Sequence, residues 1–406
     1  MAGAKTRKRI VIVGSGVAGS ILAYGLRDLA DAEVICLERA TAEDHADAGT
    51  GLNIGPNAIK ALRLYQPALA ATLEAESLPW LNWRISLTDG QELMNLPLSD
   101  VADNPGIRIR WSQLYALLRR PVQQHVRFGV EVTGMRYARV GEAGPIVIQI
   151  MDRASGRQEV IEGIDLLVAG DGRYSKVRET FLGRPQPQFF GVCIFRLLIE
   201  EAHPELIDDY EQWFKGPNRL LAFRIPGNGT YIAGSFPIEA DQDVPAEAKQ
   251  ADVLRALYTP TDGPPSAQCA FMIDAICSRV SEIHWARLQE APAEFCDSNR
   301  RILLLGDAAH PMVPTLGQGA TQAIEDACIA ADELRSALGG DGVGIAQALE
   351  RIEYRRRARV EFVVEFSRAA TDTMLAGADP VRGTLAKTGP DFRAQLMKLY
   401  RDVSAA

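Results

Sequence analysis

The 406-residue chain is poor in the residues that build metal sites and disulfide frameworks. It has five widely separated histidines and six cysteines, with no C-x-x-C pair among them. Their positions lack the ligand spacings typical of zinc and iron–sulfur sites, so we expect no metal ion. We expect the cysteines to be free thiols, as in a reducing cytoplasm. The cysteines are Cys36, Cys193, Cys269, Cys277, Cys296 and Cys328.

Long apolar runs are also missing. No stretch approaches the ~18 residues that a membrane-spanning helix needs, and no apolar leader precedes the first predicted strand. Basic blocks are equally scarce, since no basic run is longer than the three residues of 355–357. Together with the formal net charge of −8, this argues against nucleic-acid binding. We therefore expect a cytoplasmic protein that neither spans a membrane nor binds nucleic acid. We expect it to be a monomer or a homodimer, and the sequence does not distinguish the two.

Glycine, by contrast, is abundant, and its first cluster follows a predicted strand. Residues 10–13 form an apolar β-branched run, and the glycines come next at G-x-G-x-x-G spacing, before a predicted helix at 20–29. In such a turn the first glycine permits the tight bend, the second lets backbone N–H groups approach a pyrophosphate, and the third lets the helix pack on the strand. A second strand, 33–38, ends in an acid about 20 residues further on, where it can accept hydrogen bonds from ribose hydroxyls. The pattern predicts a dinucleotide site made by Gly14, Ser15, Gly16, Ala18, Gly19, Glu38 and Arg39, and it does not distinguish NAD from FAD.

Three more glycine-rich stretches follow. Residues 49–57 contain three glycines and a proline. This composition indicates a constrained loop or short strand that a ligand approaches closely. The alternative is an ordinary turn before a helix. Buried strands then end in the turns around Asp171 and Asp307. Asp307 lies where it could hydrogen-bond a ribityl hydroxyl, and the helix that opens after Gly317 could stabilise negative charge on a reduced flavin ring.

The region between these turns changes character. Short alternating runs at 193–199, 219–225 and 231–238 predict an antiparallel sheet inserted in the nucleotide-binding fold, with one face free to wall a pocket. We predict an α/β fold in three segments: the first part of a Rossmann-like domain with a hairpin insertion at 1–185, the inserted sheet at 186–285, and the second part with C-terminal helices at 286–406. Length and composition suit this architecture.

Together, the motifs around Gly14–Gly19, Asp171 and Asp307 resemble, in order and spacing, the single-component flavin-dependent aromatic hydroxylases, the para-hydroxybenzoate hydroxylase family. The stretch 49–57 is similar to that of salicylate, 3-hydroxybenzoate and 6-hydroxynicotinate hydroxylases. The resemblance covers about residues 8–365, and it implies bound FAD, a Rossmann-type domain and a sheet that covers the substrate. It also implies NAD(P)H and O₂ as co-substrates, and transfer of oxygen from a flavin C4a-hydroperoxide to an electron-rich ring carbon of a small aromatic substrate.

The resemblance further assigns roles to particular residues. It implies that Asp171 and Gly172 serve both FAD and NAD(P)H and that Asp307 binds the ribityl chain. Spacing alone allows Arg110 to be a surface arginine or a phosphate or flavin contact, and the resemblance implies that it contacts the flavin. Other cofactor contacts that it implies are Gly51, Leu52, Gly306, Pro314, Gly317, Gln318, Gly319 and Ala320, with Pro314 and 316–319 beside the isoalloxazine.

The substrate residues are the least determined. Candidates are Asn53, Arg219, Phe223, His310 and Pro314. Nicotinate-type relatives have a histidine at the position of Asn53, and a histidine and a tyrosine near Arg219 and Phe223, so the obvious base for a phenol is missing. Arg219 offers a bidentate partner for a carboxylate, or it is a surface arginine at a sheet edge. His310 either lines the pocket or the surroundings of the flavin, or packs against the loop that follows the Gly-Asp motif as a structural residue.

Two other functions stay open at this point. The first is another flavoenzyme on the same fold: an epoxidase, an oxidase or a reductase. The second is a flavin-binding interaction protein without turnover, which the sequence disfavours because the flavoprotein pattern uses almost the whole chain.

Overall fold

The computed structural model describes residues 7–41, 50–139, 144–339 and 344–403. A five-stranded parallel sheet holds the first glycine motif. Alternate residues of its central strand enter different cores: Ile10 and Ile12 on one face and Val11 on the other. Burial on both faces explains the unbroken apolar run in the sequence. In spatial order the strands are β18 (Ile302–Leu304), β12 (Leu166–Ala169), β1 (Lys8–Val13), β2 (Ala32–Glu38) and β8 (Val126–Phe128).

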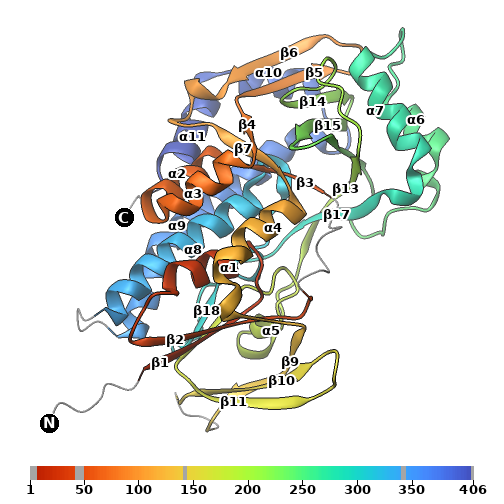
Figure 1. Ribbon diagram of the computed structural model, residues 1–406. Coiled ribbons are helices and arrows are strands. Elements are labelled where there is room, and N and C mark those ends of the chain that lie inside the picture. The colour runs from red at the N-terminus through yellow and green to blue at the C-terminus, as the bar shows by residue number, and fades with distance from the viewer. Residues whose placement is uncertain (1–6, 42–49, 140–143, 340–343, 404–406) are drawn as a thin grey trace, which may run out of the picture.

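Helices cover one face of this sheet and a small antiparallel sheet covers the other (Figure 1). The helical layer centres on α8, which packs against α1, α2 and α9. These helices are α1 (Val17–Leu26), α2 (Pro56–Tyr65), α8 (Gln318–Leu338) and α9 (Ile345–Ala369). Two further helices, α3 (Pro67–Ala75) and α4 (Trp111–Arg119), pack beside them, and the small sheet is made of β9 (Val130–Tyr137), β10 (Ile146–Asp152) and β11 (Gln158–Ile164).

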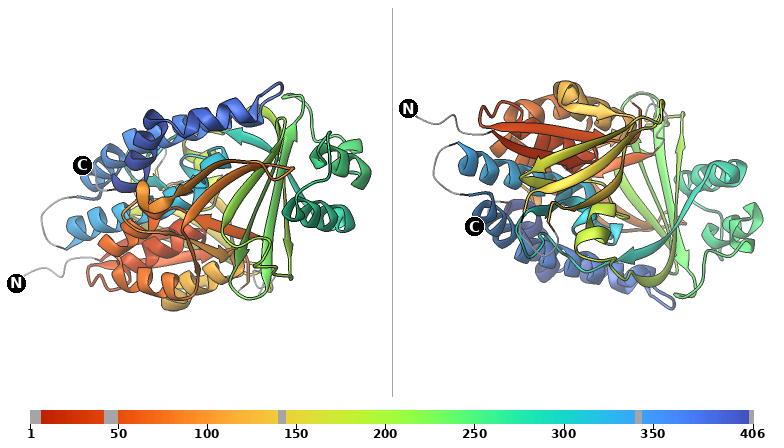
Figure 2. Two further views of the ribbon diagram at one scale, coloured as in Figure 1. Left: turned by 90° about the horizontal axis from the view of Figure 1, so that it is seen from above. Right: turned by 90° about the horizontal axis from the view of Figure 1, so that it is seen from below.

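A seven-stranded sheet stands beside this body, with a helical pair on its outer face (Figure 2). It is antiparallel except where β14 and β5 pair in parallel. The predicted segment 186–285 supplies β13, β14, β15 and β16, whereas β5, β6 and the larger part of β17 come from outside that segment. The order is β17 (His284–Glu290), β13 (Gln188–Ile199), β16 (Gly229–Pro237), β15 (Asn218–Ile225), β14 (Tyr210–Lys215), β5 (Asn82–Leu87) and β6 (Glu92–Pro97). The outer helices are α6 (Ala251–Tyr258) and α7 (Ala267–Ser278).

Smaller elements close the space between the two sheets. A three-stranded sheet of β3 (Gly51–Ile54), β7 (Gly106–Arg110) and β4 (Leu78–Trp80) joins them. The stretch 50–57 is thus a short strand followed by α2, which is one of its predicted forms, while Gly49 lies outside the described residues. The C-terminal helix α11 (Pro390–Arg401) lies against the inner face of the large sheet, where Leu396 and Tyr400 share a core with Trp83, and α10 (Pro380–Lys387) contacts β6. Within the described ranges, no helix combines the length and apolarity needed to cross a bilayer.

Candidate functional site

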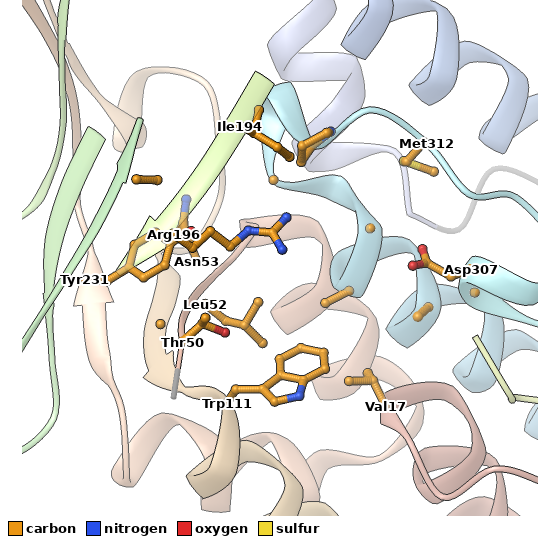
Figure 3. A pocket seen from close by; sticks show the side chains of 18 of the residues that line it. Val17, Thr50, Leu52, Asn53, Trp111, Ile194, Arg196, Tyr231, Asp307 and Met312 are labelled. Atoms are coloured by element: carbon orange, nitrogen blue, oxygen red, sulfur yellow. The ribbon is translucent and has the colours of Figure 1, made fainter. Parts of the chain in front are cut away.

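A cavity of about 530 Å³ lies where the two sheets face each other. Its floor comes from the carboxyl ends of β1, β12 and β18 and from the start of α8, and its roof comes from the inner face of the large sheet (Figure 3). Carboxyl ends of parallel strands are where such folds bind ligands. The predicted cofactor residues that line it are Gly16, Ala18, Gly51, Leu52, Gly172, Gly306, Asp307, Pro314, Gly317, Gly319 and Ala320, and the predicted substrate residues that line it are Asn53, Arg219, Phe223 and Pro314.

The three glycines of the first motif divide into two kinds. Gly14 has φ +94°, and a Cβ there would lie 2.4 Å from the Gly170 carbonyl oxygen, while a Cβ on Gly19 would lie 1.9 Å from the Gly14 carbonyl oxygen. Packing therefore demands both glycines. Gly16 faces the cavity instead, and the nearest atom to a Cβ there would be 3.7 Å away. Only the middle glycine is left open for a ligand.

The acid at the end of β2 supports the same turn. Glu38 accepts hydrogen bonds from the backbone N–H of Ser15 (2.8 Å) and of Ala40 (3.0 Å), and Arg119 lies 3.4 Å from its carboxylate. Arg119 also donates to the Ser15 carbonyl (2.8 Å), which couples α4 to the glycine turn. Glu38 and Ser15 are buried beneath the cavity lining, and Arg39 is exposed outside it. No sequence pattern singled out Arg119, because its contacts come from chain segments far away.

The Asp-Gly turn after β12 is held by its own aspartate. Asp171 accepts hydrogen bonds from the backbone N–H groups of Lys176 (2.9 Å) and Val177 (3.3 Å), which begin α5 (Lys176–Phe181). Its other oxygen is buried without a hydrogen-bond partner in the described chain, and burial raises the pKa of this carboxyl. Gly172 has φ +79° and lines the cavity, and a Cβ there would meet no atom within 4 Å.

The turn after β18 presents Asp307 to the cavity (Figure 3). This turn begins at Gly306, with φ +58°, and no hydrogen bond to the Asp307 carboxylate occurs within the described residues. Gly317, with φ +65°, then sets the start of α8, so that Gly319 and Ala320 also line the cavity. The partial positive charge of a helix N-terminus thus faces the same space as a free carboxylate.

Besides Gly14, Ser15, Gly19, Glu38, Arg39 and Asp171, three further predicted site residues lie outside the lining. Arg110 forms an ion pair with Glu200. The Gln318 side chain accepts a hydrogen bond from Asn57 (3.0 Å) beneath the cavity. His310 contacts Asp326 (2.6 Å) in a buried cluster, so packing, one of its two predicted environments, is the one that the structure gives it.

The roof carries a buried cation among aromatic rings. Arg219 is 7% exposed and has no ion pair or hydrogen bond in the described part of the chain, and burial lowers its pKa. It lies on β15, which has neighbours on both sides, so the interpretation as a sheet-edge arginine is wrong. On the same face, the ring of Phe223 lies 4.8 Å from that of Tyr231 and 5.9 Å from that of Tyr210, measured between centroids.

Several lining residues were not among the candidates. Arg196 and Tyr231 project from the roof into the cavity, and Trp111 closes it from the first residue of α4 (Figure 3). The alternation of β13 and β16 contained a signal for the first two, since every second residue of a strand shares a face. Which face is the inner one depends on tertiary packing. Other residues of this kind are Tyr115, Arg173, Ile194, Tyr210 and Met312.

Comparison with known proteins agrees with this geometry. A family model described as "FAD binding domain" matches residues 7–367. The chain belongs to this family. It is 29% identical over 381 residues to 3-amino-4-hydroxybenzoate 2-monooxygenase PtnB3 of Streptomyces platensis, covering 89% of this chain and 87% of that protein. It is 27% identical over 406 residues to salicylate hydroxylase of Pseudomonas putida, covering 92% and 88%.

The solved structure of Klebsiella pneumoniae HpxO, complexed with FAD and uric acid, has the same fold. The TM-score is 0.78 at 20% identity, covering 97% of this chain and 96% of that one. The predicted family and fold class are therefore confirmed, and the chain is an FAD-dependent flavoprotein of the monooxygenase class.

Proposed function

We propose that this flavoprotein uses NAD(P)H and O₂ to hydroxylate an aromatic or N-heteroaromatic ring that carries a carboxylate. The single observation that supports it best is Arg219, a guanidinium buried against aromatic rings without a partner among the described residues. A buried charge is costly unless it is paired. A substrate carboxylate would accept two parallel N–H bonds from it. The names of two relatives, an aminohydroxybenzoate monooxygenase and salicylate hydroxylase, fit this substrate class.

The aromatic ring would lie on the same roof. Tyr210, Phe223 and Tyr231 offer edges and faces to a planar substrate beside Arg219, and such ring contacts favour offset or edge-to-face stacking. Arg196 would lie near the ring hydroxyl, where a positive charge favours the ionised oxygen and so enriches the ring carbon in electrons. Burial of this roof would keep bulk water from the reacting atoms.

The floor suits FAD. A Cβ at Gly16 or Gly172 would meet no close atom of the protein, so the backbone is open to a pyrophosphate at both turns. The Asp307 carboxylate would accept from ribityl hydroxyls. Glu38, which accepts from the backbone N–H of Ser15 behind the glycine turn, would be the acid nearest to a ribose. When bound and reduced by NAD(P)H, the flavin supplies the activation of O₂. Pro314 and the start of α8 would border its ring, and the helix N-terminus would favour negative charge there.

Stopped-flow absorbance of the flavin with NADH or NADPH tests the proposal. The panel pairs hydroxybenzoates, aminobenzoates and hydroxypyridine carboxylates with their carboxamides. We expect one carboxylate to accelerate flavin reduction and to give hydroxylated product that matches the O₂ consumed, and we expect its carboxamide to do neither. Fast reduction without any aromatic compound, yielding only hydrogen peroxide, would instead support an oxidase or reductase.

A further inference from the structure

A buried polar cluster lies directly beneath the cavity floor, between α8 and α9. Its charged members are Glu325, Asp326, Arg356 and Arg359, joined by His310. Glu325 and Asp326 are fully buried, Arg356 is 1% exposed, and the Arg356 side chain is among the largest in the protein to be fully enclosed. None of these residues lines the cavity. The proposed oxygen transfer therefore gives them no role.

Arg356 ties this cluster together from α9. It donates to Asp326 (2.7 Å), to Glu325 (2.8 Å) and to the side-chain carbonyl of Gln322 (2.6 Å). Arg359, one turn further along α9, donates to Glu325 at 3.1 Å. Two carboxylates are thus matched by two guanidinium groups, as buried charges require.

Asp326 differs from Glu325 because its second oxygen faces the cofactor turn. Asp326 Oδ2 accepts from the backbone N–H of Gly306 (2.8 Å) and contacts His310 Nε2 (2.6 Å). Both hydrogen bonds that join the described 306–310 turn to α8 therefore end on this one oxygen. Gly306 adopts a left-handed conformation, and the next residue, Asp307, presents its carboxylate to the cavity without a partner in the described chain. The position of that carboxylate depends on the turn that Asp326 holds.

We propose that Asp326 is a positioning residue for FAD: held by Arg356 on one side, it fixes the Gly306–Asp307 turn so that Asp307 meets the ribityl chain. His310 forms the second hydrogen bond to Asp326 Oδ2 and so joins the other end of the turn to the same carboxylate. This role depends only on FAD binding by the chain. It is independent of the substrate and of oxygen transfer, so it can fail while the proposed function stands.

The test measures FAD affinity in the flavin-free protein, by quenching of flavin fluorescence, together with the visible circular dichroism of the bound flavin. Asp326→Asn keeps the size of the side chain and removes its charge. We expect it to weaken FAD binding on the order of tenfold, the effect of losing a charge-assisted hydrogen bond, and to alter the dichroism. Wild-type affinity and dichroism in this variant would overturn the proposal.

Asp297→Asn is the matched control. Asp297 is 6% exposed, accepts from the backbone N–H groups of Arg301 (2.8 Å) and Ile302 (2.7 Å), and lies outside the cavity lining. We expect this variant to lower the melting temperature of the flavin-free protein and to leave FAD affinity unchanged. An equal loss of affinity in both variants would show a general effect of destabilisation and would overturn the proposal.

His310→Phe keeps the test decisive if Asp326→Asn fails to fold. It removes one of the two donors to Asp326 Oδ2, leaves the Gly306 bond in place, and places an apolar ring beside Phe295, whose centroid is 5.9 Å from that of His310. We expect a several-fold weaker FAD complex. A complex as tight as that of the wild type would contradict the positioning role.

Discussion

Replacement of Arg219 by methionine should have opposite effects on stability and on substrate binding. Arg219 is 7% exposed and unpaired within the described residues, so the protein without substrate bears most of the cost of desolvating its charge. Replacing buried ion pairs by apolar side chains of similar volume stabilises several proteins by roughly 1 to 4 kcal/mol, and an unpaired buried charge has no attraction that the replacement would lose. For 406 residues, the entropy of unfolding is about 0.85 kcal/mol per kelvin. The melting temperature of Arg219→Met should therefore rise by roughly 1 to 5 °C.

Binding of the carboxylate substrate should fall at the same time. Removing one partner of a buried charge pair costs about 2 to 5 kcal/mol, and tenfold in affinity corresponds to about 1.4 kcal/mol. The dissociation constant should rise at least about 30-fold. The carboxamide of the same compound, which has no charge to pair with Arg219, should lose much less.

Differential scanning fluorimetry and titration of the flavin spectrum with substrate measure the two effects. Arg224→Met is the control, because Arg224 lies on the same strand, β15, on its opposite face, and pairs with Asp208 (2.6 Å) away from the cavity. It should change neither quantity by much, since exposed ion pairs contribute little. If Arg219→Met melts at a lower temperature and still binds the carboxylate normally, then Arg219 is a structural residue and the substrate class is wrong.

Three further predictions concern the cofactor floor and its supports. Gly16→Ala should weaken FAD binding and leave the melting temperature of the flavin-free protein nearly unchanged. Gly19→Ala should lower that melting temperature, because only the Cβ added at Gly19 meets the backbone. Thermal melting and FAD titration of both variants test this, and equal melting temperatures would refute the different roles of the two glycines. Arg119→Met should weaken FAD binding by on the order of tenfold, because Arg119 holds both the Glu38 carboxylate and the Ser15 carbonyl of the glycine turn. A fluorescence titration measures this, and unchanged affinity would show that the glycine turn binds FAD without Arg119. Burial alone would raise the pKa of Asp326, but the neighbouring His310 and Arg356 side chains lower it. Its contribution to stability should thus be complete above about pH 4 and be lost as the pH falls toward the folded-state pKa. Unfolding by urea at a series of pH values should show the wild type losing its advantage over Asp326→Asn in that range, and a constant difference would contradict the assignment.

The sequence alone determined the local features of this protein. The strand before Gly14, the turn and α1 follow from an apolar run and from glycine spacing, because each depends on contacts between residues close in the chain. The alternating runs of 193–199, 219–225 and 231–238 became β13, β15 and β16 for the same reason. The three glycine turns were connected to one cofactor by the order and spacing in which they resemble a flavin-dependent family.

Tertiary structure decided what depends on distant neighbours. Arg219 lies inside the sheet because β14 and β16 flank its strand, and the order of strands is not encoded in the residues around it. Arg110 pairs with Glu200, which lies 90 residues further along the chain, and His310 packs on Asp326 in a cluster closed by α9. Strand pairing and the pairing of buried charges are both long-range, so a local pattern offered each of these side chains more than one environment. Only the packed fold selected one.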